Sequence, residues 1–300
     1  MRSRLLIIHN AHAGLRQRQL LGEVRRHLEN AGAAVRIEDA QTLEQDRDLA
    51  RSAAESGAFD AVVAAGGDST IRGVACGLIG SAMPLGIIPV GTGNVLAEEI
   101  ALGRDPAALA ATLLGGPGVP VRYGRADGTP FLMMAGAGFD AHVVEHLNLP
   151  WKRQIGKMAY SWPIIRQIVQ KPKPFEVAID NRTVRATWLV VTRVAHYGGS
   201  FVIAKDQQLS DDGFQAIVTT AESRQAFAAV LIAIARGHHA ARRDVSIIPC
   251  THVRLPGSPA IAVQLDGERF APSPRELTLS DDRLTIIVPA ASPLALNAPS

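Results

Sequence analysis

The sequence predicts an α/β domain followed by a mainly β domain: an N-terminal domain with a Rossmann-like parallel sheet, then a C-terminal antiparallel β-sandwich domain. Three observations predict this. Over residues 1–120, apolar β-branched runs alternate with helical stretches, as in a parallel sheet with crossover helices. From residue 121, strand-like runs follow one another directly, as in an antiparallel sandwich. Two N-terminal runs end in glycine-rich turns, where sheets of this class bind ligands.

In the N-terminal domain, the expected elements are strands at residues 5–9, 34–38, 61–65 and 85–88 and helices at residues 15–30 and 43–56. The runs at 61–65 and 85–88 are continuously apolar, which suits strands that are buried on both faces. Short helices follow up to residue 114, and the glycine-rich stretch at 115–118 is the expected domain boundary. We therefore assign residues 1–120 to the first domain.

In the C-terminal domain, strands are expected at residues 129–135, 175–179, 183–191, 214–219, 246–248, 253–255, 260–265 and 284–288. Helices are expected at about residues 154–169 and 224–236. We assign residues 121–290 to this domain and 291–300 to a C-terminal tail.

The composition is that of an ordinary globular chain. Hydrophobic residues make up 47% and charged residues 20% of the 300 positions, and the formal net charge of +3 does not imply a nucleic-acid partner. The longest apolar run, residues 226–235, is much shorter than a membrane span. Two cysteines far apart predict no disulfide framework, so we expect a cytoplasmic protein.

The two glycine-rich turns are the strongest functional signal. The first reads AVVAAGGDST and the second PLGIIPVGTGNVLA. Glycine lets the backbone approach a ligand, and the N–H groups at the start of the next helix bind anions. A single turn of this kind is better explained as a tight connection between strand and helix. Because two follow consecutive strands, the sequence predicts a site for nucleotide phosphates.

These turns also resemble known signatures. GGDST is similar to the GGDGT motif, and PVGTGNVLA to the P-x-GT-x-N-x-x-A motif, of the diacylglycerol kinase catalytic-domain family, which includes bacterial lipid kinases and sphingosine kinases. NAD kinases and phosphofructokinases carry strings like the first motif. The second motif, at this spacing, is what distinguishes the diacylglycerol kinase family from them. The resemblance implies an active site in the interdomain cleft and transfer of the γ-phosphoryl group of ATP, with Mg²⁺, to a lipid hydroxyl such as that of diacylglycerol or a sphingoid base.

The resemblance also implies the residues that bind the nucleotide. They are Asn10, Thr42, Gly66, Gly67, Asp68, Ser69, Thr70, Gly91, Thr92 and Asn94. Asn10 belongs to an element similar to the family's N-P-x-x-G, with Ala11 where proline is usual; helix capping is the alternative role for this asparagine. Asp68 is expected to bind Mg²⁺ next to the phosphates, the alternative again being a helix cap.

Three positions depart from the family pattern. Ser69 stands where glycine is usual, which would be strained if the position has a positive φ. Val95 stands where many bacterial lipid kinases have aspartate, whereas the sphingosine-kinase branch has apolar residues. Arg122 stands where bacterial diacylglycerol kinases tend to carry an aspartate of the metal-linked network, so the charge is reversed.

The C-terminal domain is expected to supply the catalytic carboxylates and a structural metal. The resemblance implies Glu268 as the general base with Asp266 as its competitor or partner, although an Asp-Gly hairpin explains the same string. It also implies a structural Mg²⁺ held by the Leu209 carbonyl, the Asp212 carboxylate and the Phe214 carbonyl, for which a plain turn is the alternative.

The expected partner is a lipid substrate at a membrane surface, contacted peripherally at the inner face of the membrane. Basic clusters at residues 151–157, 171–173 and 236–243 would attract anionic lipid, or are solvated faces. Asp140, in a string similar to the family's G-x-G-F-D, is a further site candidate. The sequence leaves open a homodimer. Two other functions remain as alternatives: a non-catalytic nucleotide or lipid sensor, and an NAD kinase.

Overall fold

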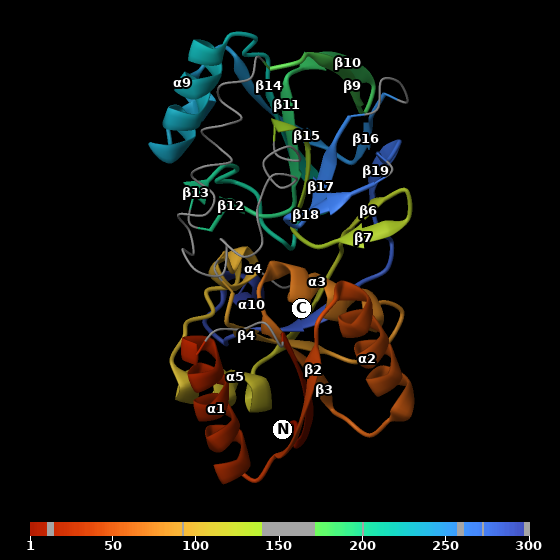
Figure 1. Cartoon of the computed structure of the whole chain (residues 1–300), viewed down its shortest axis with the longest axis vertical. Coiled ribbons are helices and arrows are strands. Elements are labelled where there is room, and N and C mark those ends of the chain that lie inside the picture. Colours follow the sequence, from red (N-terminus) through yellow and green to blue (C-terminus); the bar gives the residue numbers. More distant parts are fainter. Residues whose placement is uncertain are drawn as a thin grey trace. The chain divides into compact units, whose positions relative to one another are not determined.

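The computed structural model describes residues 1–10, 15–91, 93–139, 172–199, 201–256, 261–271 and 273–296 (Figure 1). Contacts within the chain divide it into two compact units. The first unit comprises Met1–Arg122 together with Asp281–Ser300, and the second unit comprises Tyr123–Ser280.

In the first unit, the strands are β1 (Arg4–Asn10), β2 (Ala34–Ala40), β3 (Ala61–Gly66), β4 (Leu85–Pro89), β5 (Gly118–Val121) and β20 (Leu284–Ile287). Its helices are α1 (Leu15–Asn30), α2 (Leu43–Ser56), α3 (Asp68–Leu78), α4 (Val95–Glu99), α5 (Pro106–Gly115) and α10 (Pro293–Leu296).

The strands of the first unit form one sheet in the order β2-β1-β3-β4-β20-β5. Strands β1 to β4 are parallel, as the alternation of strands and helices predicted. Helices α1 and α5 pack together on one side of the strands, and α2 and α3 on the other (Figure 1). Because both faces are covered, every residue of β3 is buried, which is why this run is apolar without alternation.

The last strand of the chain returns to the first unit. Strand β20 is parallel to β4 and antiparallel to β5, so residues 284–287 extend the N-terminal sheet. The predicted boundary at residues 115–118 and the assignment of 121–290 to one domain therefore differ from the structure, in which the chain leaves the first unit after Arg122 and re-enters it at Asp281. The pairing partner of a strand lies elsewhere in the chain, so the run at 284–288 alone could not reveal it.

Helices α2 and α3 pack closely because two glycines of α3 face α2. A Cβ atom on Gly73 would lie 2.6 Å from the Asp46 Cβ, and one on Gly77 would lie 2.2 Å from the Arg47 carbonyl oxygen. The Asp46 side chain is buried at this interface, only 6% exposed, and its Oδ1 accepts no hydrogen bond from the described residues. Burial, with a contribution from the charge of Glu44, raises the pKa of Asp46 from 3.8 to about 7.

We expect Asp46 to make the stability of the protein depend on pH. Below about pH 3 the carboxyl group is protonated in both the folded and the unfolded chain, so it carries no ionisation penalty. As the pH rises from 4 to 7, the unfolded chain ionises first, and the free energy of unfolding falls by up to about 4 kcal/mol. Urea denaturation of Asp46→Asn should show a gain over wild type at pH 8 that shrinks towards pH 4. Asp48→Asn, at an exposed position of α2, should show no such trend.

In the second unit, the strands are β6 (Gly124–Ala126), β7 (Thr129–Phe131), β8 (Met134–Gly138), β9 (Phe175–Ile179), β10 (Arg182–Ala186), β11 (Trp188–Thr192), β12 (His196–Tyr197), β13 (Phe201–Val202), β14 (Phe214–Thr219), β15 (Val245–Cys250), β16 (His252–Arg254), β17 (Val263–Leu265), β18 (Glu268–Phe270) and β19 (Glu276–Leu279). Helix α9 (Arg224–Ala235) and the 3₁₀ helix η2 (His239–Ala241) follow β14.

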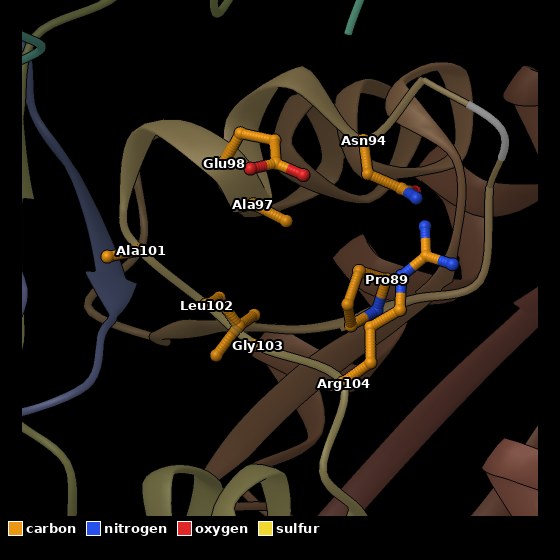
Figure 2. Close-up of a pocket in the computed structure, with 8 residues that line it drawn as sticks. All are labelled: Pro89, Asn94, Ala97, Glu98, Ala101, Leu102, Gly103 and Arg104. Atoms are coloured by element: carbon orange, nitrogen blue, oxygen red, sulfur yellow. The ribbon is translucent and has the colours of Figure 1, made fainter. Parts of the chain in front are cut away.

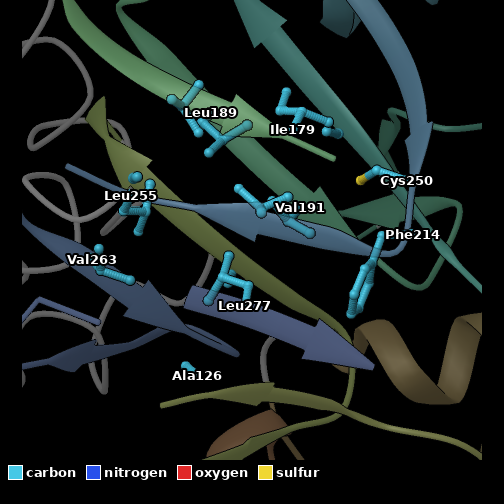
Figure 3. Close-up of a cluster of buried hydrophobic side chains, with 14 of the residues drawn as sticks. Ala126, Ile179, Leu189, Val191, Phe214, Cys250, Leu255, Val263 and Leu277 are labelled. Carbon is cyan, nitrogen blue, oxygen red and sulfur yellow. The ribbon is translucent and has the colours of Figure 1, made fainter. Parts of the chain in front are cut away.

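Two antiparallel sheets of the second unit share one core. Their orders are β10-β9-β16-β19-β6-β7 and β15-β14-β11-β8-β17-β18. Side chains such as Ile179 and Leu277 from the first of these sheets meet Val191, Phe214 and Val263 from the second (Figure 3). This arrangement is the predicted antiparallel sandwich. Burial raises the pKa of the core thiol Cys250 to about 12, so the thiol stays protonated.

Two predicted strands of this unit are each two strands in the structure. The run at 183–191 is divided at Thr187 between β10 and β11, which belong to different sheets. The run at 129–135 is divided at Leu132 and Met133 between β7 and β8. The predicted helix at 154–169 lies outside the described residues. Among the described helices, none is long and apolar enough to cross a membrane.

Candidate functional site

The predicted nucleotide residues lie at one edge of the sheet in the first unit. Strands β1 to β4 are parallel and adjacent, so their carboxyl ends reach the same edge. Gly66 at the end of β3 pairs with Pro89 at the end of β4, which starts the two glycine-rich turns side by side. Asn10 ends the neighbouring β1, and Thr42 follows β2.

The two glycine-rich turns touch through their backbones. A Cβ atom on Gly91 would lie 2.4 Å from the Gly67 Cα, closer than any side chain permits. A Cβ atom on Gly66 would lie 2.3 Å from the Thr70 side chain. Glycine at these positions is therefore required by packing, and any other residue would push the turns apart.

Asp68 connects the two turns. It is the first residue of α3, and its Oδ1 lies 3.5 Å from the Leu96 backbone N–H, near the start of α4. A Cβ atom on Gly93 would lie 2.9 Å from the Asp68 Oδ2, so this carboxylate reaches the second turn. Asp68 does not cap its own helix, because the N-cap of α3 is Gly67, and its Oδ1 instead accepts from the Leu96 N–H of α4. Its role as a metal ligand stays a prediction.

Asn94 holds the second turn closed. Its Oδ1 accepts a hydrogen bond from the Gly91 N–H at 2.9 Å, and its Nδ2 donates to the Gly91 carbonyl at 2.6 Å. The residue is 2% exposed and has a left-handed φ of 52°, a conformation that asparagine tolerates better than most residues. The structure thus gives the Asn94 amide a partner in its own loop, and its contact with a nucleotide stays a prediction.

Below the first turn, Thr70 lies against the end of β1. Its hydroxyl accepts a hydrogen bond from the Asn10 Nδ2 at 3.3 Å, and its side chain is 1% exposed. Ser69 belongs to α3 and is not among the described residues with a positive φ, so serine causes no backbone strain where glycine is usual. The other two predicted threonines are not at the first turn.

Thr42 is the N-cap of α2, and its Oγ1 accepts a hydrogen bond from the Gln45 N–H at 3.2 Å. Thr92 lies outside the described residues.

A hollow of about 340 Å³ opens beside Asn94. It is lined by Pro89, Asn94, Ala97, Glu98, Ala101, Leu102, Gly103 and Arg104, and Figure 2 shows the Arg104 guanidinium pointing toward the Asn94 side chain. Sequence analysis missed Arg104. A basic residue ten positions after Asn94 belongs to no motif, and only the path of the chain after α4 brings it back to the turn.

The chemistry of this edge fits a phosphate group with its metal. The N-cap of α3 is Gly67, which has no side chain to occupy the N–H groups of the first helical turn, and the positive end of the helix dipole favours an anion there. Asp68 would supply one carboxylate oxygen to Mg²⁺, with phosphate oxygens and water as further ligands.

The Asp-Gly hairpin of the second unit separates the two predicted catalytic carboxylates. Asp266 and Gly267 have φ values of 48° and 84°, as a two-residue type I′ turn between β17 and β18 requires. The Asp266 carboxylate is 4% exposed and accepts hydrogen bonds from the backbone N–H groups of residues 132, 133 and 134 at 2.7, 2.9 and 2.9 Å. It therefore holds the bend between β7 and β8. Glu268, at the start of β18, is partly exposed.

An arginine of the chain itself contacts one of the three predicted ligands of the structural metal. Leu209, the first predicted ligand, accepts a hydrogen bond at its carbonyl from Arg193 Nη2 at 2.5 Å. Asp212 is exposed, and Phe214 starts β14 with its ring buried against Phe131. A divalent cation on the Leu209 carbonyl would lie next to a fixed positive charge, so these residues do not fit a bound Mg²⁺. Among the described residues, no three His, Cys, Asp or Glu side chains are grouped to hold a metal.

Arg122, where the family tends to have an aspartate, forms an ion pair in the structure. Arg122 Nη2 lies 3.0 Å from the Asp281 Oδ1, so the two residues at which the chain leaves and re-enters the first unit form an ion pair. Asp140 and the basic cluster at residues 151–157 lie outside the described residues. In the cluster at 236–243, Arg242 pairs with Asp244 at 2.8 Å.

Comparison with known proteins supports the resemblance. Residues 4–126 match the model of the diacylglycerol kinase catalytic domain, and residues 133–288 match that of the YegS C-terminal NAD kinase beta sandwich-like domain. A diacylglycerol kinase of Bacillus subtilis (strain 168) is 27% identical over 293 residues, which cover 95% of this chain and 96% of that protein. A diacylglycerol kinase of Mycobacterium tuberculosis is 28% identical over 251 residues, 79% of this chain and 80% of that protein.

A crystal structure of a diacylglycerol kinase from Bacillus anthracis superposes with a TM-score of 0.70 at 17% identity and covers 95% of this chain and 96% of that chain. At this identity the likeness shows the fold alone. The two family models and the curated relatives together define a family of lipid kinases. This chain belongs to the diacylglycerol kinase catalytic-domain family, with the YegS-type sandwich as its C-terminal half.

Proposed function

We propose that the chain is an ATP-dependent lipid kinase, which transfers the γ-phosphoryl group of ATP to the hydroxyl of a lipid such as diacylglycerol or a sphingoid base. The observation that carries the proposal is the direct contact between the Gly67 and Gly91 turns at the start of α3. Two touching glycine turns with a carboxylate between them suit a triphosphate with its metal, whereas a single tight connection would need neither the second turn nor Asp68.

In this proposal the first unit binds and orients the nucleotide. Backbone N–H groups at the start of α3 donate to phosphate oxygens, and Asp68 contributes one metal ligand. The metal supplies charge neutralisation of the phosphates when it is bound. Asn10 and Asn94 also hold the turns in place, because Asn10 donates to the Thr70 hydroxyl and Asn94 closes the second turn.

Glu268 is the proposed general base. It accepts the proton of the lipid hydroxyl while the hydroxyl oxygen forms its bond to the γ-phosphorus and the bond from this phosphorus to the β-phosphate oxygen breaks, which leaves ADP. Asp266 is less suited to this task, since three backbone N–H groups already occupy its carboxylate oxygens. Its role in the proposal is to fix the hairpin that carries Glu268.

The second unit carries an apolar surface for contact with lipid. Phe201 and Val202 of β13 are 45% and 39% exposed, and Ile232 of α9, an element in contact with β13, is 52% exposed. Arg236 lies one helical turn after Ile232, and Lys205 follows β13 closely. Apolar side chains next to basic ones suit the surface of an anionic bilayer, so we infer that this surface contacts the membrane that holds the substrate.

The proposal is tested by measuring transfer of labelled phosphate from ATP to diacylglycerol, sphingosine and ceramide presented in anionic vesicles. Phosphorylation of one of these lipids is the expected result; nucleotide binding without transfer to any acceptor would contradict it and favour a sensor.

Changing Phe201 and Val202 together to serine should lower turnover on vesicles about tenfold or more and leave turnover on a water-soluble short-chain acceptor unchanged. An equal loss of turnover on both acceptors would mean that this surface does not contact the membrane.

The sensor hypothesis was motivated by the departures at Ser69 and Arg122, and it remains the alternative that the transfer assay decides. Ser69 causes no strain in α3, and Arg122 is paired with Asp281. An NAD kinase is disfavoured because residues 4–126 match the diacylglycerol kinase catalytic domain. We therefore propose no second function.

A further inference from the structure

Arg193 is a buried cation at the centre of a loop in the second unit. It follows β11, is 0% exposed and is among the largest fully buried side chains. Its backbone N–H donates to the Met133 carbonyl at 2.7 Å, which fixes the start of the side chain. A charged group buried this deeply is tolerated only where fixed dipoles or charges compensate it.

The compensation comes from one short segment, residues 209–213. Arg193 Nη1 donates to the carbonyl oxygens of Asp211 and Gly213 at 2.8 and 2.9 Å, and Nη2 donates to the Leu209 carbonyl at 2.5 Å. Three carbonyl oxygens of one loop thus point at one positive charge. Converging carbonyl oxygens from a loop are also the way in which proteins hold hard metal cations.

The loop is shaped around this charge by a second buried residue. Gln207 is 2% exposed, and its Nε2 donates to the Gln208 carbonyl at 3.0 Å and to the Asp211 Oδ2 at 3.1 Å. The same carboxylate oxygen accepts the Gln208 N–H at 2.8 Å. The carboxylate of Asp211 is therefore used to close the turn, and its carbonyl is left to face Arg193.

We infer that residues 209–213 form a cation site whose occupant is the guanidinium of Arg193, in the place of a divalent metal. The charge needed to hold the carbonyl oxygens together is covalently part of the chain, so it is present at any metal concentration. The folded second unit then needs no metal at this loop. The inference concerns the fold of the loop and holds whether or not the chain is a kinase.

The test removes the guanidinium and asks whether a metal takes its place. We would measure the thermal midpoint of the full chain without nucleotide, in EDTA and in millimolar Mg²⁺ or Ca²⁺. The wild-type midpoint should be the same in all three conditions. Arg193→Ser leaves a small oxygen ligand and an open site, so it should lose about 10 °C in EDTA and regain at least half of this loss with Ca²⁺ or Mg²⁺, in a dose-dependent way.

Two further variants make the result specific. Arg193→Lys keeps a positive charge and three donors, so its midpoint should be independent of metal, as in wild type. Arg185→Ser removes an exposed arginine of the same unit, which pairs with Glu222, and should neither lose stability to a similar extent nor respond to metal. A folded Arg193→Ser protein with no metal response would overturn the inference.

Elemental analysis of the wild-type protein keeps the inference testable even where Arg193→Ser fails to fold. After purification with Mg²⁺ or Ca²⁺ and removal of free metal, the wild-type chain should retain no stoichiometric divalent ion. One ion per chain that is lost in Asp212→Ala would show that the metal, and not Arg193, occupies the loop.

Discussion

Gly91→Ala is expected to weaken nucleotide binding about tenfold or more with only a moderate loss of stability. The new methyl group would lie 2.4 Å from the Gly67 Cα and 2.7 Å from the Asn94 Oδ1, so the two turns must separate. A phosphate that loses one backbone N–H donor loses about 1.5 to 3 kcal/mol of binding, which is about tenfold or more in ATP affinity. Overpacking of this kind costs about 1 to 3 kcal/mol in free energy of unfolding. Calorimetric titration with ATP and Mg²⁺, together with urea denaturation, would measure both effects.

Gly22→Ala is the matched control. Gly22 is in α1, and a Cβ atom there would meet no heavy atom within 4 Å. Alanine at such a position should keep ATP affinity and raise stability by about 0.5 to 1 kcal/mol. Unchanged ATP affinity in a folded Gly91→Ala protein would mean that the phosphates do not bind at these turns, and the proposed function would lose the observation that carries it.

Glu268→Gln is expected to remove phosphoryl transfer while nucleotide binding persists. The amide has the size of the carboxylate but accepts no proton, so kcat should fall by about 100-fold to 10,000-fold. The Kd for ATP with Mg²⁺ should stay within about twofold, because the predicted phosphate ligands belong to the first unit. Single-turnover transfer of labelled phosphate to the preferred lipid, with ATP affinity measured in parallel, gives both values.

Glu222→Gln is the corresponding control, since Glu222 is an exposed carboxylate of the second unit whose ion pair with Arg185 contributes little. Both kcat and ATP affinity should match wild type. A Glu268→Gln protein with wild-type kcat would take Glu268 out of the mechanism. A fall in ATP affinity equal to the fall in kcat would instead assign Glu268 to nucleotide binding.

The sequence predicts those features that depend on neighbouring residues. The runs that form β3 and β4 are apolar throughout because both of their faces are covered, and this pattern is visible without the structure. The Asp-Gly turn between β17 and β18 is equally local, because the positive φ values of Asp266 and Gly267 reflect what those residue types tolerate. Helix α9 ends within one residue of its prediction.

Pairings between distant segments were not predictable. Strand β20 pairs with β4, which lies almost two hundred residues earlier in the chain. The residues of β20 give no indication that β4 is its partner. The split of the run at 183–191 into β10 and β11 has the same cause, since the chain changes sheets at Thr187 and the residues remain strand-like on both sides. The local residue pattern predicts which residues form a strand, but it does not predict which other strand they pair with.

By itself, the sequence determined that this chain has a parallel sheet with two glycine turns, a β sandwich and the signatures of a lipid kinase family. Only the tertiary structure decided what the polar side chains do there: that Asn94 closes its own loop, that Asp266 holds a bend, and that Arg193 fills the loop at residues 209–213. The physical reason is that a polar side chain satisfies its hydrogen bonds with whatever groups folding brings within about 3 Å. These groups lie near in the sequence for Asn94 and far away for Asp266, and the residue type alone does not say which.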